Sequence, residues 1–276
     1  MNPRNTIVAV CTTAFFLSCA TNPFTGNQTL AFVSNAELFK MAFQQYDQFL
    51  IENEVVKGSS DAEMITRVGQ RIAVAAERWL NANGYQGYLK DYQWDYNLVN
   101  SKAENAWCMP GGKIVFYTGI LPIAQNETGV AAIMGHEVAH ALANHGQQRM
   151  SAAYLQAGLQ VAGNMAIKDD QTRNIFNQSY GIVSNVGGML PFSRAHESQS
   201  DEIGQLLMAI AGYNPEEATA LWKRMKVSSE GQAPPEFLST HPSPTTRIAK
   251  LQANAAKAKS EAAKFGVTSF REIKPF

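Results

Sequence analysis

The sequence predicts an α+β fold, mostly helical with a small sheet, and three observations support this class. Residues 34–57 and 61–83 carry apolar side chains at helical spacing, and residues 127–144 are rich in residues that favour helices. Residues 93–99 alternate between apolar and polar side chains, as a half-buried strand does. A Pro-Gly-Gly turn then separates two short strand-like runs. Because 45% of the residues are hydrophobic, the chain can bury one sizeable core, and we expect one domain over residues 34–276.

The N-terminus has the pattern of a bacterial lipoprotein signal. A positive charge at Arg4 is followed by an apolar run over residues 6–17, and a cysteine, Cys19, comes soon after. The run is too short to span a bilayer, which requires about 20 apolar residues. The Phe-Leu-Ser-Cys sequence that ends at Cys19 resembles a lipobox. We therefore expect residues 1–18 to be a signal peptide and Cys19 to be lipidated, with an ordinary secretory signal as the alternative.

Lipidation of Cys19 would make residues 19–33 a tether between a membrane and the domain. Residue 20 is alanine rather than aspartate, which in such lipoproteins implies sorting to the outer membrane, with the domain facing the periplasm. Loss of residues 1–18 removes Arg4 and no acidic residue, so the mature chain has a net charge of −1. A chain of near-neutral charge is not expected to bind nucleic acid.

Two helices and a strand are expected next. Asp61 is the expected N-cap of the second helix, and Asn83-Gly84 is its expected end. In the strand that follows, Trp94, Tyr96 and Leu98 share one face, because side chains alternate along a strand.

Residues 105–109 and 113–118 flank the Pro-Gly-Gly turn and predict a hairpin. An outer hairpin edge can bind an extended peptide by strand addition, through backbone hydrogen bonds that tolerate many sequences. Cys108 lies in this hairpin and is the one free thiol that would remain after cleavage and lipidation. We expect it to be buried beside the edge strand, while pairing with another chain and regulatory metal binding are the alternatives.

The most informative stretch is His136-Glu137-Val138-Ala139-His140, an HExxH sequence within the helix expected over 127–144. Histidines four residues apart are separated by about 40° around a helix axis, so both imidazoles leave the same face. They can bind one tetrahedral Zn²⁺, and Glu137 beside them can take a proton from the attacking water. The chain has five histidines, so a chance HExxH would be rare. A buried helix with two hydrogen-bonded histidines is the structural alternative.

The residues after His140 do not continue as HExxHxxGxxH, the sequence that supplies a third histidine ligand in metzincins. Ala143 stands where that pattern has glycine, and Gly146 stands where it has histidine. His145 lies nine residues after His136, roughly 180° around the helix, so we expect it to point away from the metal. Its place near the negative end of the helix dipole suits a histidine.

The third ligand is expected downstream, at Glu197. Glu197 and Asp201 are spaced i,i+4, so one helical face presents both carboxylates to the same place. A His₂Glu zinc site uses one carboxylate as a ligand and another to orient a ligand histidine through its free ring N–H. We therefore assign Glu197 as the third ligand of one Zn²⁺ per chain and Asp201 as the orienting carboxylate. Glu202 is expected to face solvent. An exposed acidic helix start is the alternative for the pair.

Four motifs resemble those of the M48 family of gluzincin metallopeptidases and follow one another along the chain in the family's order. HEVAH and the ExxxD sequence at 197–201 match the family's two metal motifs. Residues 105–119 are similar to its NAFxPGGxI/V strand–turn–strand segment, with Trp107 in place of phenylalanine, and residues 239–248 are similar to its THPSxxxRI signature. The resemblance covers residues 22–255. It implies a zincin-like fold with an HExxH active-site helix, and the lipobox favours the family's bacterial envelope lipoprotein type.

The resemblance also makes His241 a candidate catalytic residue. Zinc peptidases often place a His or Tyr donor where the tetrahedral intermediate develops negative charge, and such a donor is worth a few kcal/mol. Arg247 is the alternative oxyanion donor. A histidine that caps the Pro-rich turn at residues 242–244 is the structural interpretation of His241.

Residues 147–190 separate the two metal motifs. Within them, 152–167 is mildly apolar, contains glutamine and asparagine, and is too short for a transmembrane helix. We expect an amphipathic helix over the active-site cleft, with a lid or a membrane contact as alternatives. Further on, Pro215 is expected to start a helix that ends near Ser228, and residues 253–264 are expected to form a solvated helix.

These motifs predict a zinc endopeptidase in which His136, His140 and Glu197 hold the metal. Resemblance to M48 lipoproteins of Gram-negative envelopes implies misfolded or unassembled envelope proteins as substrates, and an envelope protease or assembly machinery as a partner. A periplasmic chaperone or assembly factor on a latent protease fold is the alternative, although a pure binder has no need of Glu137 as general base. A zinc hydrolase of non-peptide substrates fits the metal chemistry but not the peptide-binding hairpin.

Overall fold

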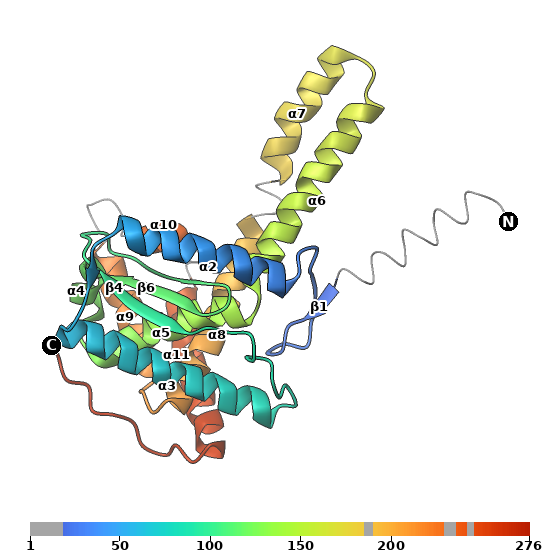
Figure 1. The fold of residues 1–276 in the computed structure, drawn as a ribbon. Helices are drawn as coiled ribbons and strands as arrows, with labels where there is room; N and C mark the ends of the chain where they lie inside the picture. The colour runs from blue at the N-terminus through green and yellow to red at the C-terminus, as the bar shows by residue number, and fades with distance from the viewer. Residues whose placement is uncertain (1–18, 185–189, 229–235, 242–245) are drawn as a thin grey trace.

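A computed structural model describes residues 19–184, 190–228, 236–241 and 246–276, and its helices surround a small mixed sheet (Figure 1). The predicted α+β class is confirmed. The strands are β1 (Cys19–Thr21), β2 (Gln28–Leu30), β3 (Val55–Val56), β4 (Asp95–Val99), β5 (Ala106–Met109) and β6 (Lys113–Tyr117). The helices are α2 (Asn35–Glu52), α3 (Ser60–Ala82), the 3₁₀ turn η1 (Thr118–Ile120), α4 (Leu121–Ala124), α5 (Glu127–Leu142), α6 (His145–Ala166), α7 (Asp170–Ser184), α8 (Leu190–Ile210), α9 (Glu216–Ser228), α10 (Glu236–Thr240) and α11 (Arg247–Lys264). The predicted signal peptide, residues 1–18, and the turn at 242–244 lie outside the described residues.

The main sheet has the strand order β3-β4-β6-β5, in which β4 and β6 run parallel and the other pairs are antiparallel. The predicted hairpin is present, because β5 pairs with β6 from Ala106↔Phe116 to Met109↔Lys113. Its turn contains Gly111 and Gly112 at φ values of 85° and 90°, which side chains with a Cβ rarely adopt. Within the described residues β5 pairs with β6 alone, so it forms one edge of the sheet.

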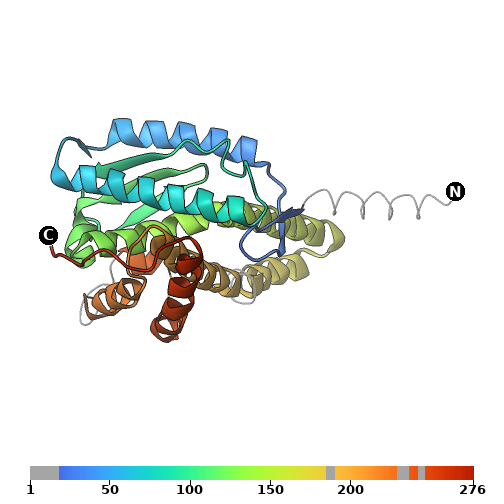
Figure 2. The same cartoon turned by 90° about the horizontal axis from the view of Figure 1, so that it is seen from below.

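The two faces of the sheet pack against different helices. Tyr46 of α2 forms a cluster with Val99 and Val115 on one face. On the other face, Leu98 and Phe116 join the main core together with residues of α3 and α5. The predicted strand side is confirmed, since Trp94, Tyr96 and Leu98 all pack against this core. Helices α8 and α9 contact α5 in turn, so α5 is buried from every side (Figure 2).

Two of the predicted helix boundaries differ from those in the structure, and one agrees. The N-cap of α3 is Ser59, whose hydroxyl accepts a hydrogen bond from the Ala62 amide, and the prediction of Asp61 is therefore wrong. The helix predicted over residues 34–57 is also too long, because Val55 and Val56 leave it to form β3. Asn83 is the C-cap of α3, as predicted.

A close helix crossing fixes the distance between the two segments that carry the metal motifs. Helix α5 carries HEVAH, and α8 carries Glu197 and Asp201. At their crossing, a Cβ on Gly135 would lie 2.7 Å from the carbonyl oxygen of Gly204, and a Cβ on Gly204 would lie 2.8 Å from the His136 nitrogen. The two backbones touch because neither residue has a side chain.

Helix α11 covers the other side of α8 and is only partly solvated. Arg247, Leu251 and Ala255 are buried along one of its faces, and Ala258 and Ala262 continue that face. The prediction of a solvated helix over residues 253–264 is therefore right for its outer face and wrong for its inner one. The predicted helix after Pro215 is present as α9 and ends at Ser228.

The segment predicted to be a lipidated tether, residues 19–33, is folded against the body. Strands β1 and β2 pair with each other, and Asn22 between them is 1% exposed. Its side chain donates hydrogen bonds to the carbonyl of Ala143 and to Gln199. These buried polar contacts hold the segment in place, and its role as a lipidated tether stays a prediction.

Helices α6 and α7 form a hairpin that projects away from the body (Figure 1). Only the first turns of α6 are buried, through His145, Gln147, Gln148 and Ser151. Residues 152–167 are helical, but the position expected for them over the active-site cleft is wrong, because they project away from the body beside α7 (Figure 1). Among the helices that the structure describes, none is long and apolar enough to cross a membrane.

Candidate metal centre

The structure brings the three predicted zinc ligands together from two helices. His136 and His140 lie one turn apart on α5, and their Nε2 atoms are 3.1 Å from each other. Glu197 comes from α8 and places its carboxylate oxygens 3.2 Å from His136 Nε2 and 3.4 Å from His140 Nε2. All three side chains are at most 5% exposed. Three donors that converge on one point in a dry interior form a pocket for a cation.

The chemistry of this donor set fits zinc. Two imidazole nitrogens and one carboxylate are the ligands of a His₂Glu zinc site. Burial alone would raise the pKa of Glu197, but hydrogen bonds from His136, His140 and His241 hold it well below its usual range, so the carboxylate is charged. Burial lowers the pKa of His140 well below the usual value and leaves the ring neutral. A charged carboxylate and a neutral imidazole are the forms that bind a metal. Burial lowers the pKa of His136, but its hydrogen bonds to Asp201 and Glu197 raise it to about 9, so His136 must release a proton when it binds the metal.

Asp201 and Arg247 support His136 from the side opposite the donors. The Nδ1 atom of His136 lies 3.0 Å from Asp201 Oδ1, as predicted for an orienting carboxylate. The Arg247 guanidinium donates a 2.6 Å hydrogen bond to the same oxygen and lies 3.3 Å from the Trp222 ring centroid. Arg247 is 2% exposed and lies 3.3 Å from His136 Nδ1 and 3.5 Å from Glu197 Oε2, and its role as an alternative oxyanion donor stays a prediction.

Glu137 lies beside the donors and is 3% exposed. Its Oε1 atom forms no hydrogen bond within the described part of the chain and lies 3.3 Å from His241 Nε2. Burial raises the pKa of Glu137, against the opposing effect of His241 and His136. A carboxylate that has a raised pKa and an oxygen without a hydrogen bond is suited to accept a proton and release it again.

His241 occupies the remaining side of the donor cluster. It follows α10 directly, and its Nδ1 atom is 3.0 Å from Glu197 Oε2 and 3.2 Å from His136 Nε2. With His136, His140 and Glu197 it forms a group of four buried donors whose atoms all lie within 4.8 Å of one another. Four protein donors around one zinc ion are typical of a closed site, whereas catalytic sites keep one position open. His241 is therefore a fourth possible donor beside the three predicted ligands.

His145 is the residue that sequence reasoning placed wrongly. Helix α5 ends at Leu142, and Asn144 takes a left-handed conformation with φ 57°, which turns the chain before α6 begins. His145 is thereby swung back toward α5, and its Nδ1 atom lies 3.0 Å from Nδ1 of His140. A continuous helix would have kept these rings apart. His145 is thus no ligand, but it does contact the ring nitrogen that His140 does not offer to the metal.

The hydrogen bonds around His145 fix the ring of His140. A His140 that binds through Nε2 carries its proton on Nδ1 and needs an acceptor there. Burial lowers the pKa of His145 to about 3, so its ring is neutral and can accept. The other nitrogen of His145 donates to Gln199 Oε1 at 2.6 Å. His145 therefore supports His140 as Asp201 supports His136.

We expect His145→Ala to weaken zinc binding by about 10–100-fold, the usual effect of removing the hydrogen-bond partner of a metal-ligating histidine. Competition with a chromophoric chelator measures the affinity, and thermal unfolding of the metal-free protein reports any loss of packing. His145→Gln restores an acceptor and should recover most of the affinity. Equal weakening in both variants would mean that His145 acts through packing alone.

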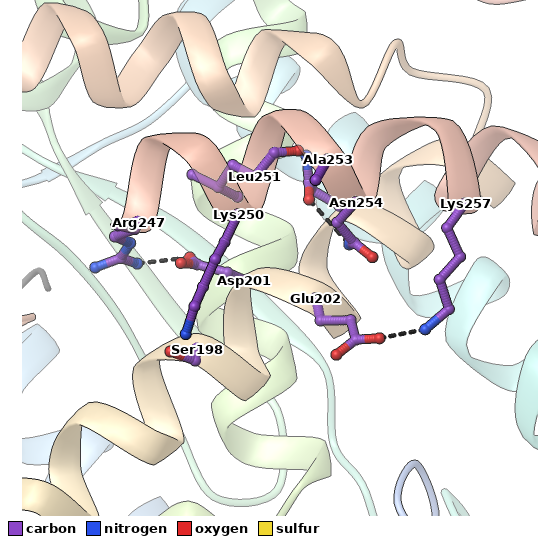
Figure 3. A pocket seen from close by; sticks show the side chains of 10 residues that line it. Ser198, Asp201, Glu202, Arg247, Lys250, Leu251, Ala253, Asn254 and Lys257 are labelled. Atoms are coloured by element: carbon purple, nitrogen blue, oxygen red, sulfur yellow. Dashed lines mark hydrogen bonds and ion pairs between the residues drawn. The ribbon is translucent and has the colours of Figure 1, made fainter. Parts of the chain in front are cut away.

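A cavity of about 450 Å³ lies between α8 and α11, on the Arg247 side of the site (Figure 3). Asp201 and Arg247 line it, whereas His136, His140 and Glu197 do not. Glu202 is exposed at its rim, as predicted, and pairs with Lys257. The cavity is therefore behind the metal donors and is not the position for a scissile bond.

Cys108 lies on the edge strand β5 and is partly exposed. Burial around the sulfur raises the pKa of the thiol well above its usual value. A protonated thiol is a poor nucleophile and a poor metal ligand. This observation favours the packing interpretation of Cys108 over the regulatory one.

Comparison with known proteins agrees with the motifs and the site. The mitochondrial metalloendopeptidase OMA1 of Schizosaccharomyces pombe is 36% identical over 166 residues, which are 59% of this chain and 47% of that protein. The OMA1 of Arabidopsis thaliana is 31% identical over 76% of this chain and 43% of its own length. The β-barrel assembly-enhancing protease of Escherichia coli K12 is 26% identical over 57% of this chain and 34% of its own length. This chain spans about half the length of the OMA1 proteins it matches. The family model of peptidase family M48 matches residues 61–255, and the chain belongs to that family.

Proposed function

We propose that this protein is a zinc-dependent endopeptidase that cleaves misfolded or unassembled proteins of the cell envelope. The observation that carries the proposal is Glu137, a buried carboxylate beside three convergent zinc donors, whose Oε1 atom accepts no hydrogen bond within the described part of the chain and faces His241. His136, His140 and Glu197 would hold a zinc ion, which would supply Lewis-acid polarisation of the scissile carbonyl and lower the pKa of the attacking water. Glu137 accepts the proton of that water and passes it to the leaving amine.

The supporting residues explain how the donors keep their orientation during the reaction. Asp201 holds His136 and is itself held by Arg247, while His145 holds His140. Each ligand histidine thus has its second nitrogen committed to a buried partner. The rings cannot turn without breaking these bonds, so the donor set is preorganised.

The edge strand β5 suggests how an unfolded chain is bound. It contacts α5, and its free side can accept an extended peptide by strand addition. Backbone pairing of this kind requires an unfolded segment and little sequence specificity. The amide of Phe237 in α10 donates to the carbonyl of Glu104 just before β5, so the segment that carries His241 sits at the end of this edge. A peptide bound along β5 would therefore lie close to His241.

The cell-envelope part of the proposal rests on the N-terminal pattern and on one relative. The lipobox-like sequence that ends at Cys19 supports an outer-membrane lipoprotein of the family's bacterial envelope type, with the domain in the periplasm. The Escherichia coli relative is, by name, a protease that enhances β-barrel assembly, which supports envelope proteins as substrates and an assembly machine as partner. The OMA1 relatives are mitochondrial by name, so they support the peptidase activity and not this location.

The proposal is tested by offering the purified protein one envelope β-barrel protein in two forms, unfolded from denaturant and folded in detergent. We expect cleavage of the unfolded form alone, its loss on removal of zinc by a chelator, and its return when zinc is added back. Suppressed aggregation of the unfolded form without any cleavage would instead identify a holding chaperone. Cleavage of both forms at equal rates would contradict selection for unfolded substrates.

The position of His241 leads to a prediction about latency. Because the Nδ1 atom of His241 lies within 3.2 Å of two predicted ligands, we propose that His241 competes with substrate for the metal. We expect His241→Ala to raise peptidase activity by a factor equal to the reciprocal of the fraction of time that the native site is open. Initial rates on an unfolded substrate measure this, with zinc content determined in parallel. A fall in activity with zinc retained would support the predicted oxyanion role instead.

A further inference from the structure

The projecting hairpin of α6 and α7 carries an unusual set of exposed apolar side chains. Large hydrophobic residues that are at least 37% exposed cluster between residues 154 and 175: Tyr154, Leu155, Leu159, Val161, Met165 and Ile175. Met165 is 81% exposed and Ile175 is 58% exposed. Residues 150–167 contain no charged residue at all. An apolar stretch of this kind on an exposed element indicates a surface that is covered in the working protein.

The two helices of the hairpin face each other through polar side chains as well as through Phe176. The amide of Gln160 on α6 donates a 3.2 Å hydrogen bond to Asn177 on α7. Arg173 donates to the carbonyl of Ile167 across the turn, and the Oδ1 atom of Asn164 is buried. Phe176 packs on Gly163, where a Cβ would lie 2.4 Å from the ring, so the two helices are tightly paired. In water a helical hairpin buries apolar side chains and exposes polar ones. Polar groups between the helices and exposed apolar side chains outside suit an apolar surrounding.

The base of this hairpin is attached to the N-terminal segment. The amide of Phe32 donates to Ser151 at 3.0 Å, and Gln147 donates to the carbonyl of Val33 at 2.7 Å. Strand β2, which contacts α6, pairs with β1 so that Leu30 lies opposite Cys19. The predicted lipid attachment site and the base of the hairpin therefore belong to one packed unit (Figure 1).

We propose that the outward face of the α6–α7 hairpin inserts into the surface of a phospholipid bilayer, next to the lipid on Cys19. The apolar side chains of α6 enter the boundary between headgroups and acyl chains, as amphipathic helices do. The charged residues at the turn, Lys168, Asp169 and Asp170, remain among the headgroups. The role of Cys19 rests on the proposed lipoprotein function, whereas the apolar surface of the hairpin does not depend on it.

The test places an environment-sensitive dye at position 159 of the full chain, through an incorporated unnatural amino acid. Vesicles of phosphatidylethanolamine and phosphatidylglycerol contain a lipid with a spin-label quencher on its acyl chain. We expect a blue shift and strong quenching at position 159. The same dye at position 74, where Val74 is 56% exposed on α3, should show neither change. An unquenched dye at 159 on vesicle-bound protein would overturn the proposal.

Two further measurements separate the other occupants and the role of the lipid. Donor and acceptor dyes at position 159 of different copies would show energy transfer, unchanged by vesicles, if a second copy covered this face, and that result also overturns the proposal. In Cys19→Ser, quenching at 159 should persist at higher vesicle concentration, because the hairpin itself inserts. The mass of the mature N-terminus tests lipidation separately, so failure of the lipoprotein assignment is distinguishable from failure of the hairpin.

A charge-introducing variant gives an independent readout. Leu159→Glu with Met165→Glu should weaken vesicle binding of the Cys19→Ser chain at least tenfold, since each carboxylate must enter an apolar layer. Val74→Glu is the matched control and should leave binding unchanged. Both residues of the double variant are more than half exposed, so cleavage of a soluble unfolded protein should be unaffected. Unchanged vesicle binding in the double variant would contradict insertion of this face.

Discussion

Glu137→Gln should abolish peptidase activity while leaving the bound zinc in place. The substitution keeps the shape of the side chain but removes its capacity to accept a proton, and general-base catalysis contributes about 10²–10⁴-fold to rate. Zinc should be retained because the donors His136, His140 and Glu197 are unchanged. Degradation of an unfolded protein, with zinc quantified in both proteins, is the measurement.

The other outcomes of this comparison are equally informative. Cleavage at the native rate would remove Glu137 from the mechanism. Absence of cleavage in both zinc-loaded proteins would indicate a latent enzyme or a holding chaperone, and His241→Ala then decides between them. If neither protein contained zinc, the assignment of His136, His140 and Glu197 as ligands would fail.

The second large effect is expected from Gly204→Ala at the crossing of α5 and α8. The new Cβ would lie 2.8 Å from the His136 nitrogen and 2.9 Å from the Gly135 carbonyl carbon. Both are backbone atoms, so the helices must move apart, and overpacking of this kind costs about 1–3 kcal/mol. The movement also separates Glu197 on α8 from the histidines on α5. We expect a lower Tm together with weaker zinc binding, measured by calorimetry and chelator competition.

Gly158→Ala is the matched control for this prediction. Gly158 lies within α6, and an added Cβ would meet no atom within 4 Å. The same substitution should therefore leave Tm unchanged or raise it slightly, by reducing the freedom of the unfolded chain. If Gly204→Ala behaved like Gly158→Ala, the close crossing would not be what fixes the ligand distance.

The sequence predicted those parts of the site whose geometry is determined within one helical turn. HEVAH places two imidazoles on one face whatever the tertiary structure, and the spacing of Glu197 and Asp201 does the same for two carboxylates. Tertiary packing brings these two helical faces together. No local sequence pattern predicts the Gly135–Gly204 contact that sets the distance between them. The hairpin at β5 and β6 was also predictable, since the Pro-Gly-Gly turn requires glycine conformations.

His145 shows why other positions were not predictable. Its expected direction assumed a continuous helix, but Asn144 adopts a left-handed conformation and reverses the chain. Asparagine is among the residues that tolerate this conformation, so Asn144-His145-Gly146 was a signal that could have been weighed. The outward direction of the apolar side chains on the α6–α7 hairpin was not predictable for another reason. Periodicity shows that a helix is two-sided but does not say which side meets its neighbour.

The burial of Asn22 limits how far from the domain a lipid on Cys19 could lie, if one is attached as proposed. Asn22 is held on the body by its hydrogen bonds to Ala143 and Gln199, and Cys19–Thr21 before it are paired with β2. Three residues span at most about 11 Å even when fully extended, so such a lipid would hold the domain close to its membrane. Cleavage would then be restricted to chains near that membrane, and location would select substrates without a sequence code.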